Sequence, residues 1–475
     1  MKKLVFSALV LSMSSIMTSG HALTVLSDTE LYDVEGQALL NLANSYDSSQ
    51  GLNFHKMSIQ ALMELNLNVK TLQLGCGGDK GAGCDIDISN IALSGLNPRI
   101  DTDGNPVFDA NGRPSSSASI TNPFIEFAIK GNSAATREVV GFRVGAEQML
   151  GLLTLGTDNV QNPTDGIKSF SGYMKMAQTQ GESLTQAAKF GLTNDQKISG
   201  NLRALSTDRR FTSKPGAEGH TGISVPAMKV NFTMPETMVS GSRMSSARVS
   251  GIRSSIPRIP LAAGSAEKPL PNTIINTPET PLPNWAADQL YVEFPALIDL
   301  GPLGQLGTHA FFKMLPGSSL DNLNLDITFE QSLNMIHNIP LNGTGGYLSL
   351  QNQNVKWQGS DAQDIAQKGW WMSFKDPIQL GYLKTENPVD ISYVLPQVAT
   401  AISDFLLRPE NKIEVNIIEA LSSTLVQEPV QRELNIDVGG FTNYNSGRPA
   451  QLTLQNQVLK NQNVTPNCFG GHKFC

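Results

Sequence analysis

Charged side chains are scarce in this sequence, and they form no block of one sign. Asp, Glu, Lys and Arg make up 16% of the 475 residues, with 42 acids against 35 bases, whereas an average soluble protein carries roughly 25%. Phosphate recognition needs clustered Lys and Arg, so the composition argues against a nucleic-acid partner. Glycine and neutral polar residues replace the missing charges, which is typical of extracellular β-proteins and of surface proteins that assemble.

Long apolar runs are also missing, apart from one at the N-terminus. Residues 4–17 form a Ser-interrupted apolar stretch behind Lys2 and Lys3, and small residues occupy positions 20 and 22. This pattern predicts a signal peptide, residues 1–22, with cleavage before Leu23. No later run reaches the length of about 18 apolar residues that a membrane-spanning helix needs. We therefore expect an exported protein without a transmembrane helix, in the periplasm, at the outer-membrane surface or outside the cell.

Only four cysteines are present, and they fall into two local pairs. Cys76 is followed by Cys84, and Cys468 by Cys475. Four cysteines allow three connectivities. The short separations and the oxidising compartment of an exported protein favour the local pairing of Cys76 with Cys84 and of Cys468 with Cys475. Structural zinc sites use closer ligand spacings, so we expect no metal site.

Common catalytic signatures are missing as well. The sequence contains no G-x-S-x-G elbow, no H-E-x-x-H pair, no P-loop and no G-x-G-x-x-G after an expected strand. The histidines of the mature chain are far apart in sequence, which leaves open only a catalytic group assembled in space. They are His55, His220, His309, His337 and His472. We therefore expect no enzyme, no catalytic or cofactor-binding residue and no cofactor.

One segment, residues 101–112, carries oxygen ligands that suit Ca²⁺. A twelve-residue calcium loop needs Gly at position six and Glu at position twelve, whereas this segment has Gly104 at four and Gly112 at twelve. Two turns on either side of Pro106, formed by Asp-Gly and Asn-Gly pairs, are the simpler interpretation. Calcium binding stays as the alternative.

Alternation of apolar and polar residues dominates the rest of the chain. A period of two is the pattern of a strand with one buried face. Helical spacing is confined to residues 37–46, 394–407 and 412–425. The expected fold class is therefore mainly β with a few helices, arranged as an antiparallel β-sandwich or as layered β-sheet domains. The alternating segments are 65–70, 85–95, 123–130, 228–234, 323–329 and 432–438.

Composition changes once along the mature chain. Residues 236–284 are rich in Ser, Pro and Arg, with five prolines from Pro269 to Pro283. Proline removes a backbone donor and is confined to sheet edges. We interpret this stretch as an extended connector or edge segment. It would join an N-terminal β-rich domain, residues 23–235, to a C-terminal β-rich domain with helices, residues 285–475.

One short pattern, L-[ST]-L-Q-N-Q-x-x-K, occurs twice, in residues 348–356 and 452–460. One repeat does not establish a solenoid, so two similar strands of a β-fold are the simpler interpretation. With a period of two, the leucines should face inward and the interleaved polar residues outward. Exposed Gln and Asn would then suit strand-to-strand assembly. The polar residues in question are Ser349, Gln351, Thr453 and Gln455.

The start of the mature chain carries a family resemblance. Residues 26–37 read L-S-D-T-E-L-Y-D-V-E-G-Q. This resembles the L-[ST]-D-x-E-L-x-D-V-x-G-Q mature start of a group of exported Gram-negative β-rich proteins, which includes Fil-type pilus or filament-assembly proteins. The paired-cysteine stretch 75–88 and the segment 123–127 are similar to that group as well. The resemblance implies a surface-associated or filament-associated protein and adds no active site.

Together these patterns predict an exported cell-surface or periplasmic structural protein, associated with pilus or filament assembly or with adhesion. Its expected partners are other surface or filament proteins, including further copies of itself. The apolar strand faces leave one alternative from another class, a periplasmic or outer-membrane-associated binder of a hydrophobic ligand such as a lipid.

Overall fold

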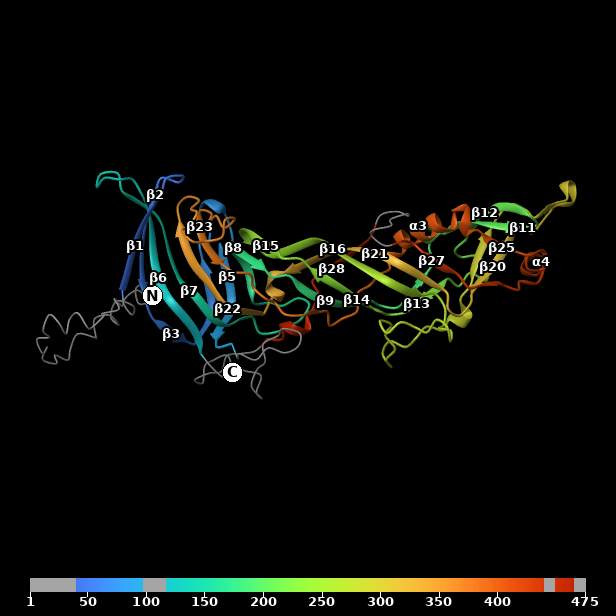
Figure 1. Cartoon of the computed structure of the whole chain (residues 1–475), viewed down its shortest axis with the longest axis horizontal. Helices are drawn as coiled ribbons and strands as arrows, with labels where there is room; N and C mark the ends of the chain where they lie inside the picture. The colour runs from blue at the N-terminus through green and yellow to red at the C-terminus, as the bar shows by residue number, and fades with distance from the viewer. Residues whose placement is uncertain (1–39, 97–116, 440–448, 465–475) are drawn as a thin grey trace, which may run out of the picture.

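The computed structural model describes residues 40–96, 117–439 and 449–464, and it shows an elongated molecule (Figure 1). A large sheet occupies one end of the long axis. A six-stranded sheet that contacts both described α-helices occupies the other end. The expected fold class, mainly β with a few helices in layered sheets, is confirmed. Among the described helices, none is long and apolar enough to cross a membrane.

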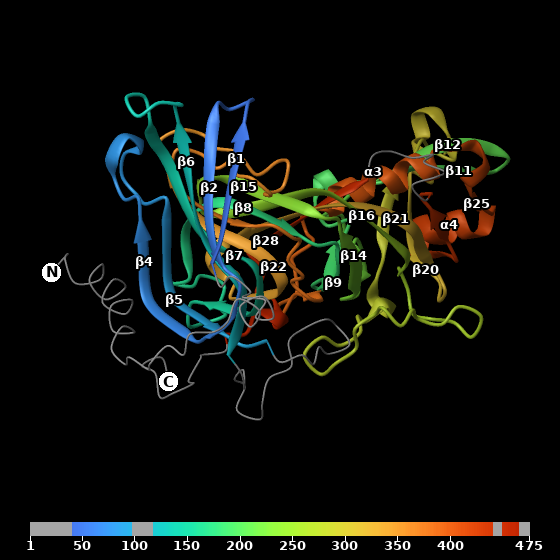
Figure 2. The same ribbon diagram turned by 60° about the vertical axis from the view of Figure 1, so that its left-hand side comes forward.

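The large sheet has eleven strands in the order β1-β2-β6-β7-β22-β23-β8-β5-β4, with β3 paired to β6 and β15 paired to β8. Along one edge β7 pairs with β6 and then β5, and along the other with β22. Because β5 also pairs with β8, strands β7, β22, β23, β8 and β5 close into a ring. Strands β6, β2 and β1 extend from this ring as a flank (Figure 2). The strands are β1 (Leu40–Asp47), β2 (Leu52–Ile59), β3 (Leu62–Leu65), β4 (Leu67–Leu74), β5 (Ile86–Ser94), β6 (Ala118–Lys130), β7 (Glu138–Leu155), β8 (Ile167–Met176), β15 (Thr237–Met244), β22 (Asn338–Gln351) and β23 (Gly369–Phe374).

The other sheets continue along the axis. A three-stranded sheet contains β9 (Thr179–Leu184), β14 (Lys229–Met234) and β24 (Leu383–Lys384). A four-stranded sheet contains β16 (Ser246–Pro260), β21 (Ser319–Ser332), β27 (Asn435–Asp437) and β28 (Ala450–Gln455). The six-stranded sheet contains β11 (Ser199–Ala204), β12 (Thr207–Ser213), β17 (Leu290–Glu293), β20 (His309–Met314), β25 (Ile413–Val415) and β26 (Val430–Arg432). Two small pairs are β10 (Ala188–Phe190) with β13 (Ile223–Val225), and β18 (Ile298–Asp299) with β19 (Gln305–Leu306). The α-helices are α3 (Leu395–Leu406) and α4 (Ile417–Val426).

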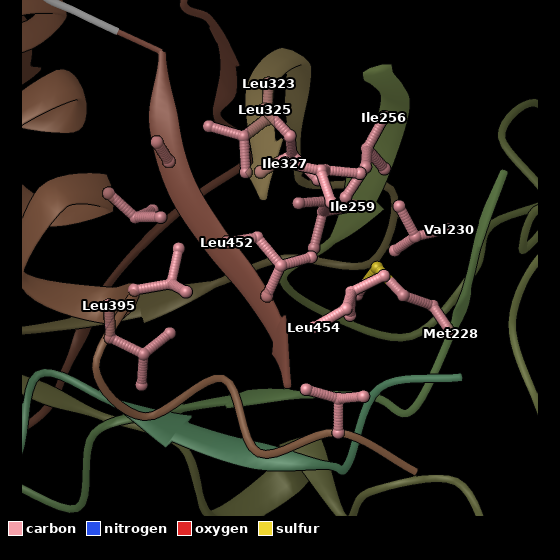
Figure 3. Close-up of a cluster of buried hydrophobic side chains, with 14 of the residues drawn as sticks. Met228, Val230, Ile256, Ile259, Leu323, Leu325, Ile327, Leu395, Leu452 and Leu454 are labelled. Atoms are coloured by element: carbon pink, nitrogen blue, oxygen red, sulfur yellow. The ribbon is translucent and has the colours of Figure 1, made fainter. Parts of the chain in front are cut away.

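A continuous apolar core fills the space between these smaller sheets. Alternate residues of β14, β16, β21 and β28 converge on it, as Figure 3 shows for Val230, Ile256, Leu325 and Leu452. A cavity of about 70 Å³ remains there, and Thr185 is the one polar residue among the described residues that line it. Small-molecule sites usually measure roughly 300–1,000 Å³. At about 70 Å³ the cavity is therefore a packing gap, because it is smaller than an ordinary ligand site.

The C-terminal helices confirm one expectation and correct another. Residues 394–407 contain α3 as expected. The expected helix 412–425 begins later, at Ile417, because the residues just before it pair with β11 as strand β25. Asn416 caps the helix. Its side chain accepts from the Glu419 backbone N–H, and the Glu419 carboxylate accepts from the Asn416 N–H, which is a capping box.

The helical expectation for residues 37–46 is wrong for its described part, which is strand β1. Leu39 and Leu40 with Ala43 suit a helix, whereas Leu40 and Leu42 suit a strand, and a short segment cannot decide between the periods. The pairing of β1 with β2 over eight residues decides for the strand. Residues 37–39 lie outside the described residues.

The large sheet combines strands from both sides of the expected connector. Strands β22 and β23 lie between β7 and β8, so a boundary near residue 285 does not separate two sets of strands. Within residues 236–284, β15 and β16 are long strands, each with one register shift, and β16 is an edge strand paired with β21. The proline-rich part, 269–283, carries an isolated bridge at Ile274. It is therefore the connector-like portion.

The second copy of the L-[ST]-L-Q-N-Q pattern lies on β28 with the expected orientation. Leu452 and Leu454 are buried, and Thr453 and Gln455 are exposed. The free side of β28 is not open to a further strand at this point. The hydroxyl of Tyr393, which precedes α3, accepts a hydrogen bond from the Thr453 backbone N–H at 2.8 Å.

The first copy, on β22, corrects the expectation. Ser349 and Gln351 are buried, and Leu348 and Leu350 are the partly exposed pair. The segment 352–368 covers the polar side of the strand, and Gln351 Nε2 donates to the Gln367 carbonyl of this segment and to the Gly369 carbonyl of β23, the latter at 2.7 Å. Alternation is thus correct for both copies, but the covered side of β22 is set by the packing of the segment 352–368 that follows it.

We expect Gln351→Lys to destabilise the fold by about 2–4 kcal/mol, because a buried ammonium would replace an amide that is bonded to the backbone. The matched change Gln455→Lys, on the exposed side of β28, should cost less than about 0.5 kcal/mol. Urea unfolding of the two variants measures the difference. Equal costs would contradict the buried position of Gln351.

Candidate functional site: an apolar face of the large sheet

The flank strands β1, β2 and β6, together with the neighbouring strand β7 of the ring, carry apolar rows on one side. Directly opposed residues of antiparallel strands project to the same side of a sheet. The register aligns Leu42 with Met57 and Met57 with Ile125. It also aligns Ile125 with Val144. These four side chains form a row across four strands; Ile125 is half-buried and the other three are exposed.

The neighbouring rows have the same character, and together they form what we call the apolar face. Leu42 is 73% exposed. Monomeric soluble proteins rarely expose large contiguous apolar patches, and those that do use them for interactions. The exposed members are Leu40, Leu42, Tyr46, Met57, Phe127, Val139 and Val144, and the half-buried members are Ile125, Ile129 and Phe142.

The opposite side of the same strands is covered and holds an ion pair. Arg143 and Glu126 are directly opposed on β7 and β6, and both are almost fully buried. Arg143 donates from Nε to Glu126 at 2.5 Å and from Nη2 to the Gln358 carbonyl at 2.7 Å. The rings of Tyr347 and Trp357 lie 5.0 and 5.1 Å from its guanidinium carbon. These contacts fix the segment around Gln358 to the sheet.

A second buried acid, Asp364, anchors the same segment. It accepts hydrogen bonds from the Tyr347 hydroxyl at 2.6 Å, from Trp371 Nε1 at 3.0 Å and from Ser373 Oγ at 2.6 Å. Burial, together with the charge of Asp364, raises the pKa of Tyr347, so this phenol stays a neutral donor. The two acids and Arg143 thus lie among buried apolar side chains such as Phe54 and Trp357 on the covered side, and alternation places the apolar face on the other side of the strands.

Strand β1 is an open edge beside the apolar face. Among the described strands it pairs with β2 alone, over eight residues and without a register shift. Edge strands commonly carry Lys, Pro or a bulge, which block the addition of another strand. The β1 sequence, LNLANSYD, contains neither Lys nor Pro. As far as the described residues go, the outer backbone edge of β1 is therefore free to pair with an incoming segment.

The disulfide loop forms a wall opposite part of the apolar face. A hollow of about 510 Å³ lies between residues 75–80 and the side chains of Val139, Phe142 and Leu350. Cys76 and Cys84 close the loop by a disulfide, which confirms that expected pairing. The hollow is large enough to take several side chains of a partner.

Arg243 of β15 holds this loop in position. Its Nε donates to Asp85 at 3.1 Å, and Asp85 also accepts from Lys80 and from the Trp370 backbone N–H at 3.0 Å each. Burial alone would raise the pKa of Asp85, but these hydrogen bonds outweigh it and lower the pKa below 3.8. The terminal nitrogens of Arg243 donate at 3.0–3.2 Å to the carbonyls of Gly75, Gly77, Lys80, Gly81 and Ala82.

A second exposed apolar surface lies on α4, at the opposite end of the long axis (Figure 1). We call it the α4 stripe, and it consists of Ile417, Ile418, Leu425 and Val426. Ile418 is 73% exposed and Leu425 67% exposed. The molecule thus presents one apolar surface near each end.

The size of the apolar face limits what it can do alone. Full burial of a large apolar side chain stabilises by about 1.5–3 kcal/mol. Its seven exposed members are about half exposed on average, so covering them would yield roughly 5–10 kcal/mol. Association of two proteins costs roughly 4–15 kcal/mol. A stable contact therefore needs an apolar partner surface or added strand pairing.

The other expected site residues contribute no chemistry to this face. Cys468, Cys475 and residues 101–112 lie outside the described residues, so their pairing and the calcium alternative stay predictions. Of the described histidines, His55 alone lies in the rows of the apolar face, aligned with Phe127. No group of three or more His, Cys, Asp or Glu residues within the described ranges could hold a metal ion.

Sequence reasoning missed the apolar face because its edge strand was expected to be helical. The available signal was the alternation of Leu40 and Leu42 with polar residues, followed by the strand pattern of residues 123–130. That pattern shows which residues share a side, but it does not show which side is covered.

Comparison of the chain with protein-family models, with curated proteins and with solved structures finds no match. Its function is therefore inferred from its own residues and their geometry.

Proposed function

We propose that this chain is an exported structural protein of the cell surface or periplasm that associates with other surface or filament proteins, further copies of itself included. The observation that carries the proposal is the apolar face beside the open edge β1. Apolar grooves and open sheet edges are two common means of binding a segment of another chain. Pilus or filament assembly, or adhesion through such an assembly, is the specific function that we propose.

The sequence gives independent support. The N-terminal pattern of residues 1–22 predicts export, and the low charge content is typical of assembling surface proteins. The resemblance of residues 26–37 to Fil-type proteins points the same way. The candidate site is lined by apolar side chains, which supports association.

The alternative function, binding of a hydrophobic ligand, has weaker support. The apolar cavity of the core measures about 70 Å³, which is below the size of ordinary ligand sites. Mass spectrometry of protein purified without detergent tests this alternative directly, because a lipid binder should retain its ligand in stoichiometric amount.

The assembly proposal predicts the behaviour of a deletion strain. Cells that lack the chain should lose a surface filament or assembly in electron micrographs, and the wild-type chain should restore it. A Leu42→Asp/Phe127→Asp chain should be exported in equal amount but should fail to restore the assembly, because two carboxylates would then occupy the apolar face.

The matched control is Val160→Asp, at a site that is 47% exposed and lies outside the apolar face and the α4 stripe. It should restore the assembly as the wild type does. An unchanged surface in the deletion strain, or full restoration by the Leu42→Asp/Phe127→Asp chain, would contradict the proposal. Cell fractionation of the same strains shows in which compartment each chain accumulates.

A further inference from the structure

We propose that the apolar face of one copy binds the α4 stripe of a second copy, so that copies join head to tail. This inference rests on the proposed structural function and names the partner of its surface. Two observations carry it: the inverted packing of α4, and the position of the two apolar surfaces at opposite ends of the molecule.

Helix α4 is packed with its small residues inward. Ala420 and Ser423 are almost fully buried against the molecule, whereas Ile418 and Leu425 point to solvent. With 3.6 residues per turn, Ile418 and Leu425 are seven positions apart and lie on one side. A surface helix of a monomer normally turns its large apolar residues to the core. The arrangement of α4 instead matches a helix that inserts its apolar side into the groove of a partner.

The structure holds α4 firmly in this orientation. Arg432 donates from Nη2 to the Glu419 carboxylate at 2.6 Å, which lowers the pKa of Glu419. Ser423 Oγ accepts from the Phe311 backbone N–H at 2.8 Å, and Thr424 Oγ1 donates to the His309 carbonyl at 3.0 Å. These bonds attach the inward side of the helix to β20. The outward stripe is therefore presented without rearrangement.

The two surfaces complement each other in shape and chemistry. The apolar face is a sheet with a hollow of about 510 Å³ beside its disulfide loop, and the α4 stripe is a projecting apolar helix. Both lie on one chain near opposite ends of its long axis (Figure 1). A contact between unlike surfaces of identical subunits is heterologous, and it generates an open filament unless the rotation closes a ring.

A symmetric contact between two copies leaves one kind of apolar surface exposed to water. Two large sheets packed face to face would leave both α4 stripes in water, and two paired stripes would leave both apolar faces in water. The head-to-tail contact covers one surface of each kind at every joint. In a row of copies this single kind of contact therefore covers both apolar surfaces of every interior copy, whereas either symmetric contact alone covers only one of them, and burial of apolar area is the main favourable term in association.

Sedimentation velocity of the mature, disulfide-intact chain tests the inference. The weight-average mass of the wild type should rise with concentration beyond that of a dimer. Leu42→Asp, on the apolar face, and Leu425→Asp, on the α4 stripe, should each weaken self-association at least tenfold. Val160→Asp should behave as the wild type. A wild type that stays monomeric at high concentration, or a Leu425→Asp chain that associates normally, would overturn the inference.

A mixture of the two weakened variants distinguishes head-to-tail from symmetric association. The Leu42→Asp chain keeps an intact α4 stripe, and the Leu425→Asp chain keeps an intact apolar face. Mixed at equal amounts, they should form a one-to-one dimer and no larger species. A mixture that stays monomeric while each variant alone is folded, by circular dichroism, would overturn the head-to-tail contact.

Photo-crosslinking identifies the partner surface directly. A benzoylphenylalanine placed at position 418 should crosslink to residues 40–59 or 125–144 of another chain, as peptide mapping by mass spectrometry shows. Crosslinks from α4 to α4 would overturn the inference. These outcomes leave the proposed function separately testable, because a face that binds a different surface protein would still abolish restoration in the Leu42→Asp/Phe127→Asp strain.

Discussion

Replacement of Arg143 by alanine is expected to destabilise the protein by about 3–5 kcal/mol, which is the usual cost of removing one partner of a buried ion pair. Glu126, the partner, is almost fully buried, and it would keep a carboxylate with no cation beside it. The Gln358 carbonyl would lose its donor as well. Urea unfolding followed by circular dichroism measures the loss.

A double variant separates the charge from the packing. Arg143→Met with Glu126→Gln removes both charges and keeps similar side-chain volumes, so it should cost less than Arg143→Ala alone. The guanidinium also packs against the rings of Tyr347 and Trp357, and methionine retains an apolar contact with them. If Arg143→Ala cost less than about 1 kcal/mol, the pair would be no stronger than a solvent-exposed one.

The same variant connects the covered side of the sheet to the candidate site. Arg143 and Asp364 hold the segment 352–368 on the polar side of β22. Loss of the Arg143 contacts should therefore loosen this segment and expose the covered side of the sheet as well. We therefore expect Arg143→Ala to increase binding of an apolar dye such as ANS before the main unfolding transition, whereas Leu42→Asp should reduce it.

Much of the strand content could be predicted from alternation, because a period of two is a local property of the chain. The strands around residues 123–130 and 323–329 were predicted in this way, and β6 and β21 confirm them. The order of the strands could not be predicted. Strands β22 and β23 join the large sheet from a distant part of the sequence, and their pairing depends on long-range contacts.

Which side of a strand is covered is likewise a tertiary property. Ser349 and Gln351 occupy the same pattern positions as Thr453 and Gln455, yet only the first pair is buried. The difference comes from segment 352–368, which covers one side of β22. The candidate site was hidden for this reason, since apolar side chains are ordinarily expected on the covered side.

Helix α4 is a second element whose exposed side could not be predicted from the sequence. Its helical spacing was visible in the sequence, and its apolar residues would ordinarily be assigned to the core. In the structure the small residues Ala420 and Ser423 face inward instead, and Ser423 and Thr424 are hydrogen-bonded to β20. Local pattern thus predicted the helix, and only its packing showed the exposed stripe.

The stability that the disulfide loop contributes should depend on pH, because the loop contacts the carboxylate of Asp85. The pKa of Asp85 is lowered in the folded chain, so its contribution to stability is present above the unfolded pKa of about 3.9 and is lost as the pH falls through the folded value. We therefore expect the unfolding free energy of the wild type to fall as the pH is lowered below about 4. Other carboxylates with lowered pKa values add to this slope, so the comparison with an Arg243 variant identifies the part that belongs to Asp85.

Arg243→Ala is expected to lower the unfolding free energy by about 2–4 kcal/mol, because it takes one cation from buried Asp85 and the donors from five loop carbonyls. Arg243→Lys should recover only part of the loss, since an ammonium cannot donate in both directions of the guanidinium fork. The unfolding free energy of Arg243→Ala should also fall less steeply as the pH is lowered, because Asp85 then loses one of the hydrogen bonds that lower its pKa.

Removing the disulfide tests whether Arg243 acts on the loop itself. A Cys76→Ser/Cys84→Ser chain should be less stable by about 2–3 kcal/mol, as expected for so short a loop. Arg243→Ala should cost less in that chain than in the disulfide-bonded chain, because both features restrain residues 75–84 and their effects overlap. Strictly additive costs would show that Arg243 stabilises β15 rather than the loop. Overlapping costs, together with weaker self-association of Arg243→Ala, would show that the loop is held in place as one wall of the hollow beside the apolar face.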